Sequence, residues 1–82
     1  MPVTSAQLRM ARAALNWTVR DLAEATGLHR NTITNIEVGR YTGDSKSLEL
    51  MERALKKAGI EFIDENGGGP GVRLRKPQRK KP

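Results

Sequence analysis

The chain has 82 residues, of which 37% are hydrophobic, and it carries a formal net charge of +6. This length is enough for one small domain with one compact core, and it argues against a large substrate cavity. The chain has no cysteine and a single histidine, and its apolar runs are short, so we expect no disulfide, metal, cofactor or small-molecule ligand, no membrane span, and a cytoplasmic location.

The first predicted helix begins after Thr4 and ends near Leu15. Thr4 and Gln7 have the spacing of a capping box, in which two side chains satisfy backbone N–H groups at the start of a helix. Leu8, Ala11 and Leu15 recur at helical spacing, which predicts the buried face of this helix.

A second helix is predicted over about residues 19–26. Thr18 and Asp21 repeat the capping-box pattern at its start. Ala23 is small enough to lie where two helices cross at a steep angle, and Gly27 can adopt the positive φ that ends a helix and reverses the chain. A third helix is therefore expected after a turn of only a few residues.

The third helix is predicted over about residues 29–38. Leu28, Ile33 and Ile36 recur at helical spacing and predict its buried side. Ile33 follows Ala23 and Gly27 at the spacing of a helix-turn-helix that reads DNA. The opposite, outward side carries the candidate base-reading residues, which are Arg30, Asn31, Thr34 and Asn35.

A loop over residues 40–44 precedes a fourth predicted helix that ends near Ala58, with Leu48, Met51 and Leu55 on one face. Beyond Gly59 the apolar residues alternate, which predicts two short strands around residues 60–63 and 72–75. A β-hairpin is the natural interpretation, although its glycine-rich connection is a poor determinant of strand register. A disordered linker after residue 64 is the alternative.

The excess positive charge is confined to the end of the chain. Residues 72–82 hold six basic residues and no acidic one, whereas residues 1–71 are electrically balanced. Residues 76–82 are therefore predicted to form a disordered basic tail that contacts DNA phosphates. The alternative is a solvated chain end without a role.

From residue 5 to about 59 the sequence resembles the phage repressor and Cro family of helix-turn-helix proteins. The resemblance rests on Trp17-Thr18, Asp21-Leu22-Ala23, Gly27-Leu28, Thr32-Ile33, Ile36-Glu37 and Gly39. It implies a compact helical bundle with the third helix in the DNA major groove, and a structural ion pair between Arg12 and Glu37. Val19 departs from the glutamine common in the family, and His29 from the usual serine or threonine.

The candidate contacts follow from the chemistry of DNA. Arginine matches the two acceptors of guanine, asparagine matches the N6 and N7 edge of adenine, and a threonine can contact the thymine methyl. Candidate phosphate contacts lie at the helix starts and in the loop after the third helix. They are Thr18, Arg20, His29, Arg40, Thr42, Ser45 and Lys46. For His29, simple solvation is the favoured alternative.

The predicted architecture is mostly α: a four-helix DNA-binding domain over residues 1–59, a hairpin over 60–75, and the tail over 76–82. The hairpin is the expected homodimer contact, through Ile60, Phe62, Ile63, Val72 and Leu74. It could instead pack on its own domain, and dimers could form on DNA through the helical domains.

The predicted function is a nucleoid-associated transcription regulator, most simply a repressor that binds an inverted-repeat operator as a dimer. An antitoxin or antiactivator that uses the same fold to hold a protein partner is the alternative. The sequence contains no recognisable nucleophile or acid–base set, so an enzyme is not expected.

Overall fold

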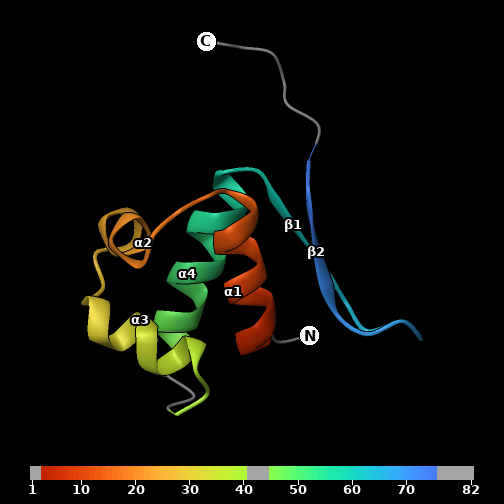
Figure 1. Cartoon of the computed structure of the whole chain (residues 1–82), viewed down its shortest axis with the longest axis horizontal. Coiled ribbons are helices and arrows are strands. Elements are labelled where there is room, and N and C mark those ends of the chain that lie inside the picture. The colour runs from red at the N-terminus through yellow and green to blue at the C-terminus, as the bar shows by residue number, and fades with distance from the viewer. Residues whose placement is uncertain (1–2, 41–44, 76–82) are drawn as a thin grey trace, which may run out of the picture.

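A computed structural model of the chain describes residues 3–40 and 45–75. In this part of the chain, helices are followed by a two-stranded antiparallel sheet (Figure 1). The elements are α1 (Ser5–Ala14), α2 (Val19–Thr26), α3 (Arg30–Glu37), α4 (Ser45–Lys57), β1 (Ile60–Ile63) and β2 (Gly71–Leu74). Helices α1 and α4 stand between α3 on one side and the hairpin on the other. The predicted fold, a mostly helical domain followed by a hairpin, is confirmed.

Two capping boxes start α1 and α2 as predicted. The Thr4 hydroxyl accepts from the Gln7 N–H at 3.1 Å, and the Thr4 N–H donates to the Gln7 side chain at 2.9 Å. Thr18 and Asp21 repeat both bonds at 3.1 and 2.9 Å. Each box satisfies backbone N–H groups that the helix itself leaves unpaired, which fixes the first turn.

The turns between helices use residues that tolerate a positive φ. Asn16 follows α1 with φ 59°, and Gly27 ends α2 with φ 81° while its N–H donates to the Ala23 carbonyl at 2.8 Å. Asparagine and glycine adopt this conformation at least cost. Helix α3 is one residue shorter at each end than expected, because His29 and Val38 are its N-cap and C-cap.

The core is built from all four helices and the first strand. Its fully buried apolar residues are Leu8, Ala11, Leu22, Ile33, Ile36, Met51, Leu55 and Ile60. Ala23 and three residues expected to face inward, Leu15, Leu28 and Leu48, are half-buried against this cluster. In the described part of the chain, no helix combines the length and apolar character needed to cross a membrane.

The hairpin has a defined register. Ile60 pairs with Leu74, and Phe62 pairs with Val72, so these four side chains share one face of the sheet. The connecting residues 64–70 are hydrogen-bonded, since the Glu65 carboxylate accepts from two glycine N–H groups of the loop. The alternative of a disordered linker is therefore wrong.

Gln7 joins the hairpin to α1. Its side-chain nitrogen donates to the carbonyls of Ile63 and Gly71, at 3.0 and 2.9 Å, and these two residues form the last pair of the ladder. At the opposite end of the ladder the Arg75 N–H donates to the Gly59 carbonyl at 2.8 Å. The register is thus held at both ends by bonds outside the glycine-rich connection.

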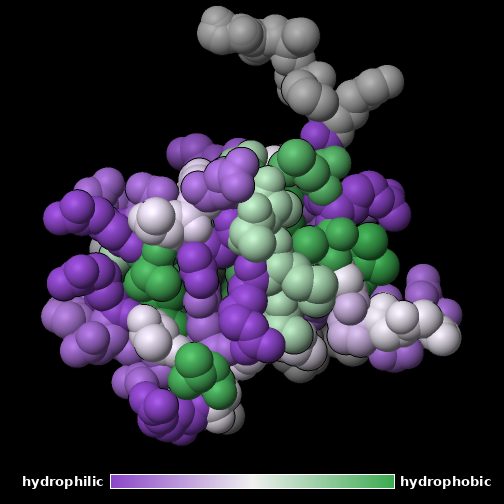
Figure 2. Space-filling model, viewed as in Figure 1, coloured by the Kyte–Doolittle hydropathy of each residue, from purple (hydrophilic) through white to green (hydrophobic). Residues whose placement is uncertain are grey.

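The hairpin packs on the helices of its own domain. Ile60 is 1% exposed, and Phe62 and Val72 are half-buried against the core, so the chain's own domain covers part of the hairpin's apolar face. Leu74 remains 52% exposed at the end of β2. In Figure 2, hydrophobic residues gather over α1 and the hairpin, whereas hydrophilic residues cover most of the side that carries α2 and α3.

Candidate nucleic-acid interface

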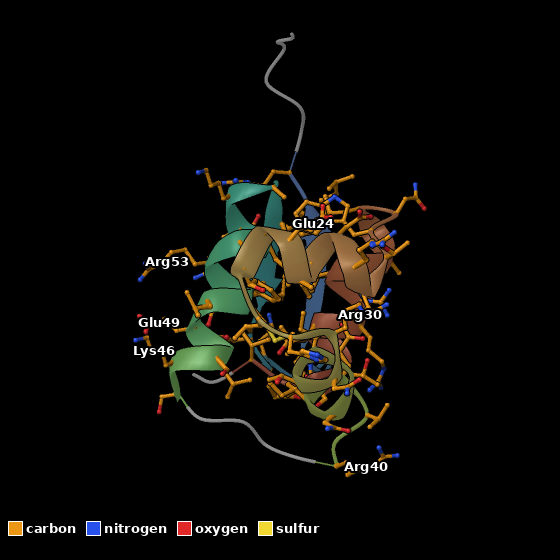
Figure 3. The ribbon with its side chains drawn as sticks, turned by 90° about the vertical axis from the view of Figure 1, so that its left-hand side faces the viewer. Glu24, Arg30, Arg40, Lys46, Glu49 and Arg53 are labelled. Atoms are coloured by element: carbon orange, nitrogen blue, oxygen red, sulfur yellow. The ribbon has the colours of Figure 1, made fainter. Side chains whose placement is uncertain are left out.

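Helix α3 presents a polar face without an exposed acid. Ile33 and Ile36 are buried, whereas Arg30, Asn31 and Thr34 are exposed and Asn35 is half-buried. The acidic residue of this helix, Glu37, is 3% exposed. Figure 3 views the molecule from the side of α2 and α3, with the hairpin behind them. The four base-reading candidates therefore lie on one helix, and no carboxylate of that helix would repel a phosphate backbone.

Arg12 and Glu37 form an ion pair between α1 and the last turn of α3. The guanidinium donates to both carboxylate oxygens at 2.9 Å, and it also donates to the Trp17 carbonyl at 3.0 Å. The Glu37 side chain is 4% exposed and that of Arg12 is 24% exposed. The hydrogen bond to Glu37 raises the pKa of Arg12 above its ordinary value, against the opposing effect of burial.

Two further residues of α1 contact the same end of α3, and the sequence pattern did not point to them. The Ser5 hydroxyl donates to the Ile36 carbonyl at 2.7 Å, and the Arg9 guanidinium donates to the Glu37 backbone carbonyl. Carbonyls in the last turn of a helix lack partners within the helix, so these donors satisfy them. Together with Arg12, they fix α3 against α1.

His29 caps the opposite end of α3. Its Nδ1 accepts from the Asn31 N–H at 3.0 Å, and the residue has the extended backbone of an N-cap. An accepting Nδ1 carries no proton, so the neutral ring keeps its proton on Nε2. His29 thus takes the place of the serine or threonine usual in the resembled family, and a donor remains on its exposed ring.

The C-terminal end of α3 closes in a Schellman motif. Gly39, with φ 77°, donates its N–H to the Ile36 carbonyl, and the Arg40 N–H donates to the Asn35 carbonyl, both at 3.1 Å. This turn brings Arg40 back against Asn35. The Arg40 guanidinium then donates to the Asn35 side-chain oxygen at 3.1 Å, a contact between two candidates that were assigned separate roles.

The site is thus a short helix with a polar outward face, which its neighbours hold on a compact bundle. A comparison with known families identifies this arrangement. The family model for helix-turn-helix domains of the Cro/C1 type matches residues 8–62. The chain belongs to the Cro/C1-type helix-turn-helix family. The predicted resemblance is thereby confirmed. No curated protein matches the chain.

Members of this helix-turn-helix family are DNA-binding transcription regulators and are generally not enzymes. DNA binding is therefore the function of this chain at the level of its class. In the described ranges, no group of histidine, cysteine, aspartate and glutamate residues could hold a metal ion.

The phosphate candidates of this helix-turn-helix protein lie at the starts of α2, α3 and α4 and, for Arg40, just after the end of α3. Thr18 is exposed and accepts from Asp21, which leaves its hydroxyl hydrogen for another acceptor. Arg20 is exposed on α2, and Ser45 and Lys46 are exposed at the start of α4. In Figure 3, Arg40 lies at the lower end of the view and Lys46 at the edge of α4. The candidate at position 42 and the tail over 76–82 lie outside the described residues.

Helix α4 carries alternating charges that pair with one another. Arg53 contacts Glu49 at 3.3 Å and Lys56 contacts Glu52 at 2.9 Å, each four residues apart. Arg53 is 72% exposed. Such exposed pairs stabilise a helix slightly.

Proposed function

We propose that the protein represses transcription by binding an inverted-repeat operator as a homodimer, with α3 in the major groove and the start of α2 against the backbone. The observation that carries this proposal is the outward face of α3, where Arg30, Asn31 and Thr34 are exposed and the helix's acid is buried. Side chains of these types on one short helix match the donor and acceptor pattern of base edges.

Occupancy alone is sufficient for repression by a domain of this size. Most of the described chain is taken up by the bundle and its hairpin, and a bound dimer would obstruct polymerase wherever the operator overlaps a promoter. A cytoplasmic, nucleoid-associated location follows from this proposal, because that is where the operator would be.

The homodimer is proposed to form through the outer part of the hairpin. Ile60 is buried in the core of its own chain, which leaves the exposed Leu74 and the half-buried Phe62, Ile63 and Val72 to contact a second copy. Two-stranded sheets also leave unpaired backbone groups at their edges, which a second copy related by a two-fold axis could pair. Two recognition helices read more base pairs than one, and this raises affinity without new types of contact.

The position of the hairpin has a consequence for the operator. Because α3 and the hairpin lie on opposite sides of the domain (Figure 1), a hairpin-mediated dimer places its two α3 helices at the outer ends. Successive major grooves on one face of DNA recur about every 34 Å. The distance between the two half-sites of the operator therefore measures how far apart the dimer holds its two α3 helices.

A selection from random duplex DNA tests this function. The full-length protein should enrich a motif made of two inverted half-sites, and a footprint should show protection of both. A protein that used this fold only to hold a protein partner, as an antitoxin or antiactivator could, would enrich no sequence. That result would refute the proposal.

A further inference from the structure

At the end of α3, a hydrogen bond joins Asn35, a base-reading candidate, to Arg40, a phosphate candidate. The Schellman motif that ends the helix places the Arg40 backbone N–H 3.1 Å from the Asn35 carbonyl. The side-chain bond between the same two residues, also 3.1 Å, is exposed. A backbone turn therefore fixes the two residues next to each other at the surface that is proposed to face DNA.

The contact determines which hydrogen-bonding groups Asn35 can offer. An asparagine side chain has one accepting oxygen and an NH₂ group with two donors, whereas an arginine has donors only. Because Arg40 can only donate, the atom that faces it must be the Asn35 oxygen. This bond leaves the NH₂ group of Asn35 and the remaining N–H groups of Arg40 to face a ligand. The two side chains together therefore present hydrogen-bond donors.

A surface of donors distinguishes guanine from adenine. In the major groove guanine presents two acceptors, O6 and N7, whereas adenine presents the N7 acceptor beside the N6 donor. An asparagine that reads adenine must accept from N6 through its oxygen. In Asn35 that oxygen already accepts from Arg40. Its second lone pair remains, but the guanidinium donors beside it oppose the N6 donor of adenine, so the pairing of asparagine with adenine is disfavoured at this position.

Asn31 provides the contrast within the same helix. Its backbone N–H donates to His29, but its exposed side chain makes no hydrogen bond with any described residue. Its oxygen and its NH₂ group are both available, as pairing with adenine requires. Asn31 can therefore pair with adenine, whereas Asn35 is expected to pair with a different base.

We propose that Asn35, held by Arg40, forms a guanine-specific reader in each half-site, and that Arg40 determines base choice through this contact. This inference rests on the proposed function, because it needs α3 to lie in the major groove. It assigns Arg40 a role in base choice that a phosphate contact alone would not have, since phosphate contacts carry no sequence information.

The test is a set of parallel selections from random duplex pools with four full-length proteins: wild type, Asn35→Ala, Arg40→Ala and Arg53→Ala. The base pair read by Asn35 is the one whose preference disappears in Asn35→Ala. Arg53→Ala is the matched control, because it also removes one exposed arginine, whose contact is with Glu49 on α4. Melting curves check that each variant is folded, and Arg40→Met, which keeps the aliphatic part of the side chain, replaces Arg40→Ala if that variant is not.

The wild type should prefer guanine over adenine at the Asn35 base pair by about five- to 160-fold, the range for one good base contact. Arg40→Ala should shift that preference toward adenine, because the Asn35 oxygen becomes free. Arg53→Ala should leave it unchanged. A wild-type preference for any other base, or an Arg40→Ala protein with the preferences of the wild type, would overturn the inference while leaving the proposed function in place. A wild type that enriches no motif would overturn the proposed function itself.

Discussion

Arg12 is the residue through which α1, the turn before α2 and the end of α3 are joined. Its guanidinium contacts both oxygens of the Glu37 carboxylate and the Trp17 carbonyl. Replacement by alanine leaves a nearly buried carboxylate without its partner, and breaking a buried ion pair in this way costs about 3–5 kcal/mol. We expect Arg12→Ala to lower the melting temperature strongly.

The control for this prediction is Arg53→Ala. Arg53 also contacts a glutamate, but both side chains are more than half exposed, and such pairs contribute about 0.3–0.5 kcal/mol. Thermal unfolding followed by circular dichroism compares the two variants. Equal stability losses would show that the pair of Arg12 and Glu37 is solvated in solution.

At the scale of residues, the sequence predicts which side of α3 faces outward, because helical periodicity depends only on local spacing. Ile33 and Ile36 are buried as expected. The ion pair of Arg12 and Glu37 came from family resemblance and not from spacing. The contacts of Ser5, Arg9 and Arg40 with α3 did not emerge from the sequence, because exposed polar residues carry no periodic signal for their partners.

The hairpin shows at the scale of elements how a single side chain holds a strand pair to a helix. Gln7 accepts from the Thr4 N–H through its oxygen and donates through its nitrogen to the carbonyls of Ile63 and Gly71. A glutamate at this position could still cap the helix, but it would set a buried carboxylate against two carbonyl oxygens. Gln7→Glu should therefore destabilise the protein by about 1–3 kcal/mol or more, the cost of leaving buried polar groups unsatisfied.

Amide hydrogen exchange measures where this loss occurs. Exchange should become faster in β1 and β2 than in α2 and α3, because the hairpin loses its attachment first. Glu65→Gln is the matched control: the amide oxygen can still accept from the Gly67 and Gly69 N–H groups, whose bonds to Glu65 are exposed. If exchange in the hairpin were unaltered in Gln7→Glu, the two bonds would not hold it.

The sequence predicts helices and turns well where the residues that define them are close together in the chain. The capping pairs and the glycine after α2 mark the helix starts and turns, and the structure has them there. The sequence favours a hairpin after residue 59 but leaves a disordered linker as the alternative, because the glycine-rich connection gives no register. The bonds that hold the strands in place come from Gln7, 56 and 64 residues away along the chain, and the burial of Ile60 depends on the same tertiary packing.

For the whole molecule, the oligomeric state is the first property to test. Leu74 is 52% exposed at the end of the hairpin, and Val38 is 53% exposed after α3. If the hairpin forms the dimer contact, Leu74→Glu should place a charge in that interface and shift the protein from dimer to monomer. Light scattering across a concentration series measures the mass.

Val38→Glu is the control for this variant, since it introduces the same charge at an equally exposed valine just after α3. It should leave the mass unchanged. The hairpin contact would be refuted by a monomeric wild type, or by dissociation in Val38→Glu alone. Substitution is preferable to truncation after residue 59, because truncation also removes Ile60 from the core.

The basic tail makes a separate prediction about salt. Truncation after Arg75 removes residues 76–82 and keeps Arg75, whose guanidinium donates to the Lys56 carbonyl at 2.8 Å. If the tail contacts phosphates, the plot of log affinity against log salt should flatten by up to about 0.9 for each lost contact. The preferred operator should stay the same. A slope equal to that of the full chain would show that the tail makes no phosphate contact.

The central claim is that the outward face of α3 reads DNA sequence, and selection of random duplex DNA by wild type and Arg30→Ala tests it most directly. Arg30 is exposed at the first position of α3, and a good base contact is worth about 1–3 kcal/mol of discrimination. The wild type should enrich one motif, and Arg30→Ala should lose the preference at one base pair of each half-site while the other positions are retained. An unchanged motif in Arg30→Ala, or no motif for the wild type, would contradict the account.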